Sequence, residues 1–438
     1  MENAQYETTA QHSAYLGTEP IRRLLLKFSV PCVLSMLVSA LYNIVDQIFI
    51  GQGVGYLGNA ATNVVYPFTV IALAVSLLIG DGSAALLSLS LGRRDAEEAH
   101  RSVGNCISLT VLCAILLTLV GFVWQDDILR LFGVTAECMD YAHAYMLPIL
   151  ISLPFYMFTS ACNGIIRADG SPQYAMASTI MGAVMNLILD PIAIFVLHWG
   201  VSGAAIATVI GQFASAALVW CFNFKFNPEV QLAWKYVKLH GQIVRSILTV
   251  GIPSVVMNGI GSVMNFGMNQ ILQGFTETAT GVFGVYFKLQ SFFFMPLFGL
   301  NNATISIIAY NYGARKPHRI TKTLKISCTA ALCIMTAGLL VFQFFPDLLL
   351  GLFNPSQAFL EIGRVALRTI SWSFPIAAVC IALGASFQAL GNGIYSTIVS
   401  LCRQLVVLLP VAYLLSLTGE VQRVWLAFPI AEIVSGTV

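Results

Sequence analysis

The chain is poor in charged residues. Only 10% of its 438 residues are Asp, Glu, Lys or Arg, whereas 57% are hydrophobic. Soluble domains carry roughly 25% charged residues, so this composition excludes an ordinary soluble protein and predicts a polytopic membrane protein embedded in a lipid bilayer. The net charge of +2 gives no support for nucleic-acid binding, because the basic residues lie in connections between apolar segments. We expect no nucleic-acid partner.

The N-terminal residues, the cysteines and the histidines each argue against another class of protein or site. Residues 1–20 are polar and include Glu2, Glu7 and Glu19, the wrong start for a cleavable signal peptide. The ten cysteines fall mostly inside apolar segments with no close pair at metal-ligand spacing, so we expect neither a disulfide framework nor a metal–thiolate site. The six histidines lie near segment ends or in connections. A membrane-embedded enzyme would need a nucleophile–base pair or a set of metal ligands, so we expect no enzyme, no catalytic residue and no resident cofactor.

Long apolar segments are abundant instead. A helix that spans a bilayer needs about 20 mostly apolar residues, and a window of that length predicts twelve such helices. The fold expected is therefore an all-α integral membrane protein with twelve transmembrane helices. The predicted segments cover residues 21–50, 57–91, 99–124, 139–166, 172–198, 201–224, 242–273, 280–312, 320–345, 358–387, 393–417 and 422–438.

The two halves of the chain repeat. Pro31 matches Pro253 and Asn43 matches Asn265, in each case 222 residues later. Five further pairs lie 221 residues apart: Ser83 and Thr304, Gly92 and Gly313, Phe132 and Phe353, Pro154 and Pro375, Gly170 and Gly391. An even number of helices returns the chain to the same side, so the repeat predicts two six-helix bundles related by a pseudo-twofold axis along the membrane normal, enclosing a central cavity. We assign an N-lobe to 1–224, a cytoplasmic linker to 225–241 and a C-lobe to 242–438.

The basic residues predict the orientation of the chain. Sixteen of the 22 Lys and Arg lie at the N-terminus or in the even-numbered connections, whereas the odd-numbered connections carry mainly acidic residues such as Asp126, Asp127 and Glu277. Short cytoplasmic connections are enriched in Lys and Arg. Both termini are therefore expected in the cytoplasm, in the inner membrane of a prokaryote.

The stretch Asn186-Leu187-Ile188-Leu189-Asp190-Pro191 is the most unusual in the chain, because it lies deep inside an apolar run. A carboxylate at this depth costs roughly 2.5–3.5 kcal/mol on insertion scales. Asn186 and Asp190 are four residues apart and share one face of a helix, and Pro191 deprives the Leu187 carbonyl of its helical partner. These oxygens suit a proton or a small hard cation. The alternative is a buried Asp that caps a kink and binds no ion.

Two other polar residues lie inside predicted spans. Asp46 lies in the first, three residues after Asn43, so the two are expected on one face. Thr208 follows the small residues Gly203, Ala204 and Ala205 in the sixth span. Small residues let helices approach closely, and taken alone Thr208 is interpreted as a packing residue.

With these motifs the chain resembles the multidrug and toxic compound extrusion (MATE) transporters of the DinF-like branch, over essentially its whole length. The matching features are the two six-helix halves, Asp46, Asn186-x-x-x-Asp190-Pro191 and Thr208. The runs Phe287–Phe292, Gly299–Asn302 and Ala309–Gly313 are also typical of that branch. The resemblance implies that Asp46, Asn186, Asp190 and Thr208 bind the coupling proton or sodium ion, the sodium at Asn186, Asp190 and Thr208. It also implies export of bulky organic cations. Another branch has a carboxylate in the seventh helix, which is absent from Pro253–Gln273 here.

Candidates for the substrate cavity are less specific. Lys288 and Arg403 can contact an anionic part of a substrate, or pair with Glu432 and hold the C-lobe together. Aromatic and methionine side chains can line an adaptable pocket, although such residues more often face lipid or core. The candidate set is Asn43, Met264, Asn265, Lys288, Phe292, Met295 and Arg403.

The leading hypothesis is a monomeric, cation-driven antiporter that exports amphipathic, mostly cationic compounds by alternating access. If Asp46 and Asp190 approach each other, repulsion and desolvation favour a proton on one of them. With Asn186 and Thr208 they can instead hold sodium, and the sequence does not choose between the two ions. The alternative is a flippase or exporter of a specific lipid-linked or anionic molecule on the related fold, which requires a strongly basic cavity.

Overall fold

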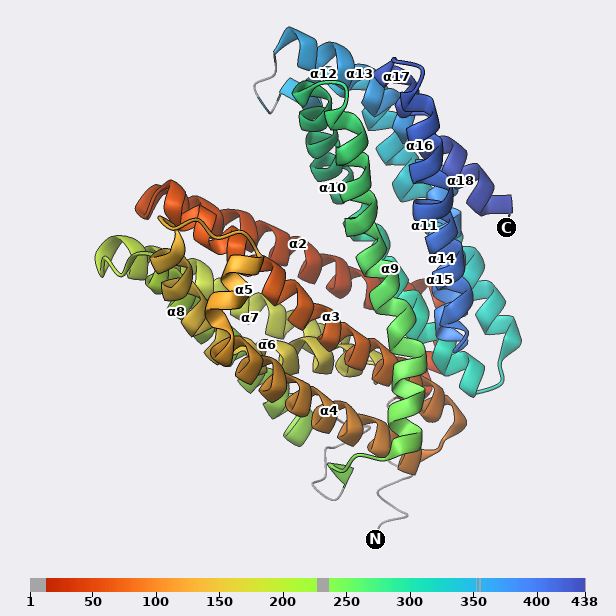
Figure 1. Cartoon of the computed structure of the whole chain (residues 1–438). Coiled ribbons are helices and arrows are strands. Elements are labelled where there is room, and N and C mark those ends of the chain that lie inside the picture. The colour runs from red at the N-terminus through yellow and green to blue at the C-terminus, as the bar shows by residue number, and fades with distance from the viewer. Residues whose placement is uncertain (1–12, 227–235, 352, 354–355, 438) are drawn as a thin grey trace. The chain divides into compact units, whose positions relative to one another are not determined.

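The computed structural model describes residues 13–226, 236–351, 353 and 356–437, and all regular structure in these ranges is helical (Figure 1). The N-terminal half contains η1 (Ser13–Gly17), α2 (Ile21–Gly53), α3 (Tyr56–Arg93), α4 (Ala96–Val123), α5 (Gln125–Leu131), α6 (Met139–Ala168), α7 (Pro172–Pro191), η2 (Ile192–Val196), α8 (Gly200–Cys221) and η3 (Phe222–Phe226). The rest contains α9 (Gly241–Gln273), α10 (Glu277–Gly313), α11 (Pro317–Phe344), α12 (Pro346–Gly351), α13 (Gln357–Ser371), α14 (Phe374–Ala389), α15 (Gly393–Leu401), η5 (Cys402–Leu408), α16 (Leu409–Ser416), α17 (Val421–Val424) and α18 (Ala427–Thr437).

Membrane-spanning helices dominate this structure. Ten helices in the described ranges are long and apolar enough to cross a bilayer, or eleven when the bent pair α13 and α14 counts as one span. Helices suit this setting because lipid offers no partners for backbone N–H and C=O groups, and a helix pairs them internally. The predicted all-α membrane fold is confirmed, and the first nine predicted segments coincide with helices to within a few residues.

The twelfth predicted span, 422–438, is interrupted by a turn in the described residues. The four-residue α17 ends at Val424, the chain turns at Trp425 and Leu426, and α18 then runs for only 11 residues. The apolar window read this segment as continuous because a turn made of apolar residues does not interrupt hydrophobicity.

The tenth predicted span, 358–387, is a pair of helices rather than one. α13 and α14 meet at Trp372 and Ser373 and are bent by 46°. Pro375 lies in the first turn of α14, where the missing N–H of a proline costs no hydrogen bond. The proline therefore favours a new helix start, which explains the break inside one apolar run.

The described chain separates into two compact units. Unit 1 contains 30–252, with the N-terminal residues up to Glu19 and Gly313–Arg315, and unit 2 contains Pro20–Ser29, Pro253–Tyr312 and 316–438. These bounds differ from the predicted lobes 1–224 and 242–438 at two places. The first turns of α2, predicted in the N-lobe, belong to unit 2, and the first turns of α9, predicted in the C-lobe, belong to unit 1. Both exchanges end beside the repeated prolines Pro31 and Pro253. The middle of the predicted linker, 227–235, lies outside the described residues.

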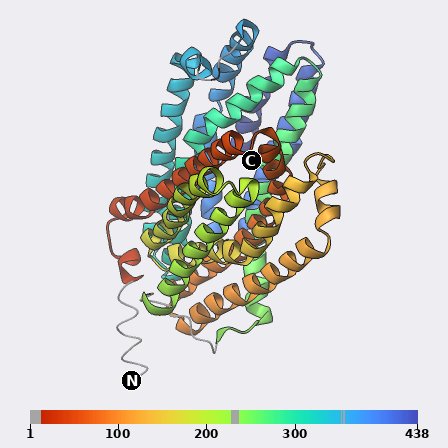
Figure 2. The same ribbon diagram turned by 90° about the vertical axis from the view of Figure 1, so that its left-hand side faces the viewer.

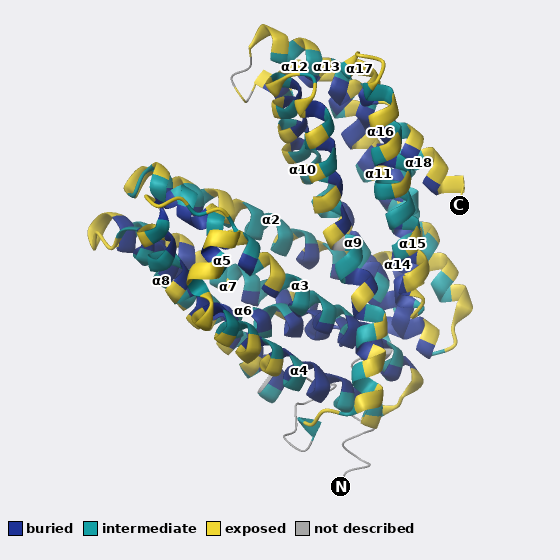
Figure 3. Cartoon of the chain, in the orientation of Figure 1, coloured by how far each residue is buried: buried dark blue, intermediate teal, exposed yellow. Residues whose placement is uncertain are grey.

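The core of unit 1 forms where α3 packs along α6, and where α6 and α7 pack on α8. Figure 2 shows these helices running side by side when the view of Figure 1 is turned. Gly80 of α3 faces the backbone of Ala161 on α6, where a Cβ at Gly80 would lie 2.8 Å from the Ala161 Cα. Buried residues, dark blue in Figure 3, are concentrated along these contacts. This close packing holds α6, α7 and α8 together around the polar residues described below.

Candidate ion-coupling site

The four polar residues predicted to bind the coupling ion come from three helices of unit 1. Asp46 lies on α2, Asn186 and Asp190 on α7, and Thr208 on α8. All are buried, with exposed fractions of 6% for Asp46, 3% for Asn186, 1% for Asp190 and 7% for Thr208. Burial of two carboxylic acids at membrane depth is costly, so the surroundings of these groups decide what the site does.

The structure brings the four side chains together. The Asn186 Nδ2 donates a hydrogen bond to the Thr208 Oγ1 at 3.0 Å, which joins α7 to α8. The carboxyl groups of Asp46 on α2 and Asp190 on α7 lie close enough to interact with each other. Just beyond Asp190, α7 ends at Pro191 and the chain continues as the π-helical η2. π-helical turns inside longer helices occur frequently at functional sites.

Four buried oxygens in this cluster have no hydrogen-bond donor from the described residues: the Asp46 Oδ1, the Asn186 Oδ1 and both Asp190 carboxyl oxygens. Two ionised carboxylates are acceptors only and repel each other. A proton shared between the carboxyl groups, or a small cation among the oxygens, would satisfy the pair. Among the described residues no group of three or more His, Cys, Asp or Glu is placed to hold a metal ion, so such a cation would depend on the Asn186 amide and the Thr208 hydroxyl as well.

Two tyrosines that the sequence analysis did not single out complete the site. Tyr42 of α2 lies beside Thr208 and within electrostatic range of both carboxyl groups. Tyr145 of α6 lies in the same range of Asp46 and Asp190. Phenolic hydroxyls donate and accept, so both can orient polar partners without adding charge. The sequence could have indicated Tyr42 by its spacing, because it lies one helical turn before Asp46 and therefore on the same face of the helix.

Asn43 does not share the buried face of Asp46, which corrects the sequence expectation. Its side chain is exposed, and its Nδ2 donates to the Ser39 carbonyl at 2.8 Å in its own helix. A separation of three residues rotates the side chain by about 60° from its neighbour around a helix. That rotation leaves Asp46 in the interior of unit 1 and Asn43 on its surface.

The cavity candidates of unit 2 do not share one environment. Met264 on α9 is buried and Asn265 is half-buried, whereas Lys288 and Phe292 on α10 are exposed and Met295 is half-buried. Arg403 on η5 is paired: its Nη1 lies 3.2 Å from Oε1 and 3.4 Å from Oε2 of Glu432 on α18. The pairing of Arg403 with Glu432 is the alternative that the sequence left open, whereas Lys288 is exposed.

The Arg403–Glu432 pair yields a stability prediction, because each side chain is only 14% exposed. Removing one partner of a buried pair typically costs about 3–5 kcal/mol, since the other charge is left unpaired. We expect Glu432→Gln alone to lower the melting temperature of purified protein more than Glu432→Gln combined with Arg403→Met. The exposed pair Asp347–Arg364 is the control, where Asp347→Asn should cost less than about 1 kcal/mol. Equal damage in the single and double variants would argue against the pairing.

Comparison with known proteins gives the family. The MatE family model matches the chain twice, at residues 31–192 and 253–414. The two matches are equal in length and begin 222 residues apart, the offset predicted from Pro31 and Pro253. The predicted duplication is thereby confirmed.

Relatives and solved structures agree with this match over nearly the whole chain. The multidrug export protein MepA of Staphylococcus aureus (strain MRSA252) is 25% identical over 94% of this chain and 91% of its own length. The probable multidrug resistance protein YoeA of Bacillus subtilis (strain 168) is 24% identical over 93% and 90%. A solved multidrug resistance MATE family transporter of the MOP superfamily, in an outward-facing conformation, superposes with a TM-score of 0.90 at 25% identity, covering 98% and 96% of the two chains. The chain therefore belongs to the MatE family.

Proposed function

We propose that this chain is a secondary active exporter of amphipathic, mostly cationic organic compounds, driven by exchange for protons or sodium ions. One observation carries the proposal: the buried carboxyl pair Asp46–Asp190, with donor-free oxygens beside Asn186 and Thr208. A site of this kind is costly to keep in a membrane unless an ion visits it. The names of the relatives, multidrug export and resistance proteins, support the substrate class.

The arrangement of the site suggests how ion binding changes the protein. The four residues connect α2, α7 and α8, and the two carboxyl groups repel when both are ionised. A proton or sodium ion removes that repulsion and favours a packing in which α2 and α7 are close. An ion and an exported compound that prefer different packings are coupled, because each shifts the population that the other binds.

Charge distribution disfavours the flippase alternative. A strongly basic cavity requires several free basic groups at depth. Of the two candidates, Arg403 is paired with Glu432, which leaves Lys288 on α10. Resistance limited to a single anionic compound in cells that express the protein would favour the flippase instead. The bias of Lys and Arg toward alternate connections supports cytoplasmic termini and an inner-membrane location.

Efflux of a fluorescent organic cation from everted membrane vesicles tests the proposal. Proton and sodium gradients are imposed separately, and vesicles without the protein are the control. We expect one of the two gradients to drive transport of the dye and the other to have little effect. Transport that ignores both gradients would contradict an ion-coupled mechanism.

A further inference from the structure

A short chain of hydrogen bonds leads from Asp46 out to the hairpin between α2 and α3. The Gln47 Nε2 donates to the Asp46 Oδ2 at 3.3 Å, and the Thr62 Oγ1 lies 3.1 Å from the Gln47 Oε1. The same hydroxyl lies 2.8 Å from the Asn59 carbonyl oxygen. Gln47 thus donates to the Oδ2 of Asp46, whereas the Oδ1 has no donor from the described residues.

We propose that Gln47 and Thr62 are positioning residues for the coupling site: Gln47 holds the Asp46 carboxyl group toward Asp190, and Thr62 holds the amide of Gln47. This inference rests on the proposed function and adds two residues to the machinery. A free aspartate side chain rotates about two bonds, and fixing one carboxyl oxygen fixes where the other lies. Binding improves when the geometry of its ligands is set in advance.

The chemistry of the two residues fits this role. A glutamine amide presents an N–H edge and a carbonyl edge, so Gln47 can bond an ionised Asp46 with the first and, turned over, a neutral Asp46 with the second. Thr62 has one hydroxyl hydrogen and two acceptors in reach. It can donate to Gln47, or donate to Asn59 and accept from Gln47. The chain Asp46–Gln47–Thr62 therefore stays bonded in either state of Asp46.

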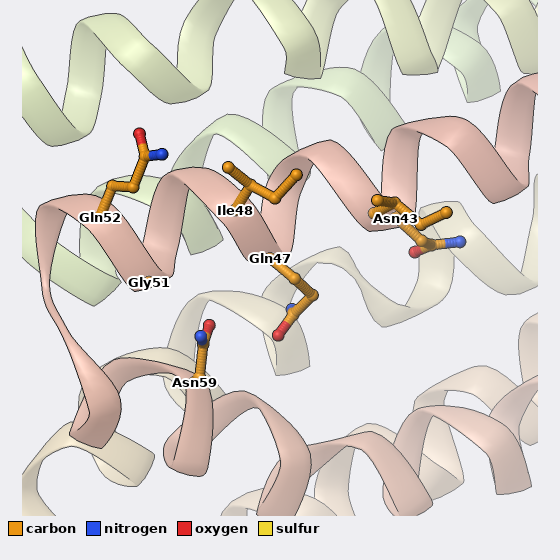
Figure 4. Close-up of a pocket in the computed structure, with 7 residues that line it drawn as sticks. Asn43, Gln47, Ile48, Gly51, Gln52 and Asn59 are labelled. Carbon is orange, nitrogen blue, oxygen red and sulfur yellow. The ribbon is translucent and has the colours of Figure 1, made fainter. Parts of the chain in front are cut away.

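The hairpin makes Gln47 accessible from one side. Asn43, Gln47, Ile48, Gly51 and Gln52 on α2, together with Asn59 on α3, line an open pocket of about 550 Å³. Figure 4 shows the Gln47 side chain extending from α2 toward the helix that carries Asn59. Gln52 lines the same pocket more than one turn further along α2 and is exposed. It offers a matched glutamine outside the hydrogen-bond chain of Asp46.

The test compares how export depends on the coupling ion in five proteins: wild type, Gln47→Met, Thr62→Val, Thr62→Ser and Gln52→Met. The ion is whichever one drives the wild type, and the dye is the organic cation used in the vesicle assay. Gln47→Met and Thr62→Val should raise the half-saturating ion concentration about fivefold, the scale of one lost hydrogen bond, with a smaller change in maximal rate. Thr62→Ser keeps the hydroxyl and should stay near wild type, as should Gln52→Met.

Several outcomes would overturn the inference. Unchanged ion dependence in Gln47→Met and Thr62→Val would show that neither residue positions Asp46. Equal impairment of Thr62→Ser and Thr62→Val would show that the hydroxyl is not the determining group. If Gln47→Met does not accumulate in the membrane, the comparison of Thr62→Val with Thr62→Ser still tests the inference. The proposed function fails separately, when transport by the wild-type protein ignores both ion gradients.

Discussion

The single variants Asp190→Asn and Asp46→Asn are each expected to leave a folded protein in the membrane and to reduce gradient-driven export to background. Asparagine is nearly the same size as aspartic acid, so the packing around the two side chains is kept. The change supplies an N–H donor to the facing carboxyl group. The pair is then satisfied with no ion bound, and one state of the transport cycle is fixed.

The size of the effect follows from coupling. When two binding sites are coupled, a ligand at one site typically changes the binding free energy at the other by about 1–3 kcal/mol, or the affinity by roughly 5–150-fold. An ion that binds the two helix packings with equal affinity contributes none of this coupling free energy, however well the exported compound binds. Equilibrium binding of the compound to purified variants should therefore survive, while transport against a gradient is lost.

The measurement is dye efflux by variants shown to be present at wild-type levels in the membrane. Asp140→Asn is the matched control, because Asp140 is exposed in the first turn of α6. It makes the same chemical change outside the site and should export normally. Wild-type export by both Asp190→Asn and Asp46→Asn would remove the carboxyl pair from the mechanism.

Much of this site was predictable from the sequence because charge is rare in apolar segments. Asp46 and Asp190 stand out in their spans, and the four-residue spacing of Asn186 and Asp190 placed both on a buried face, as the structure shows. Thr208 was different. Taken alone it was interpreted as packing, and only the structure shows its hydrogen bond to Asn186, since no periodicity within one helix reveals a partner on another.

The hairpin between α2 and α3 shows what was missed and why. Gln47 and Thr62 meet because the chain reverses at Gly55, whose φ of +89° suits a residue without a side chain. The two residues lie at similar distances on either side of that glycine, so an antiparallel pairing could have suggested their contact. A polar residue near the end of a span is common, however, and neither Gln47 nor Thr62 carries a charge that would mark it as unusual.

The division into units was also hidden in the sequence, and it gives the second large prediction. α9 begins the second half of the repeat, yet its residues up to Ile252 belong to unit 1 with α3. Two glycines make this possible. A Cβ at Gly251 on α9 would overlap the Leu78 carbonyl oxygen on α3, and a Cβ at Gly82 on α3 would overlap the Ile247 carbonyl oxygen on α9. Small residues at such crossings let membrane helices approach closely.

Gly251→Ala is therefore expected to lower the stability of the protein, although alanine favours a helix more than glycine does. The helix propensity gain is about 1 kcal/mol. It is outweighed because the obstruction is backbone on a neighbouring helix, which moves only if the whole crossing of α3 and α9 opens, and overpacking a tight contact costs typically 1–3 kcal/mol, occasionally more. Less folded protein should be recovered in detergent, with a lower melting temperature.

The control is Gly259→Ala on the same helix, where the added Cβ meets no atom within 4 Å. With no clash to offset the propensity gain, this variant should melt at the wild-type temperature or slightly above it. Gly82→Ala, which obstructs the same crossing from the α3 side, should reproduce the loss seen for Gly251→Ala. Because both substitutions open one contact, their double variant should lose less than the sum of the two single losses. Wild-type melting of Gly251→Ala would show that α3 and α9 are not packed as closely as the glycines allow.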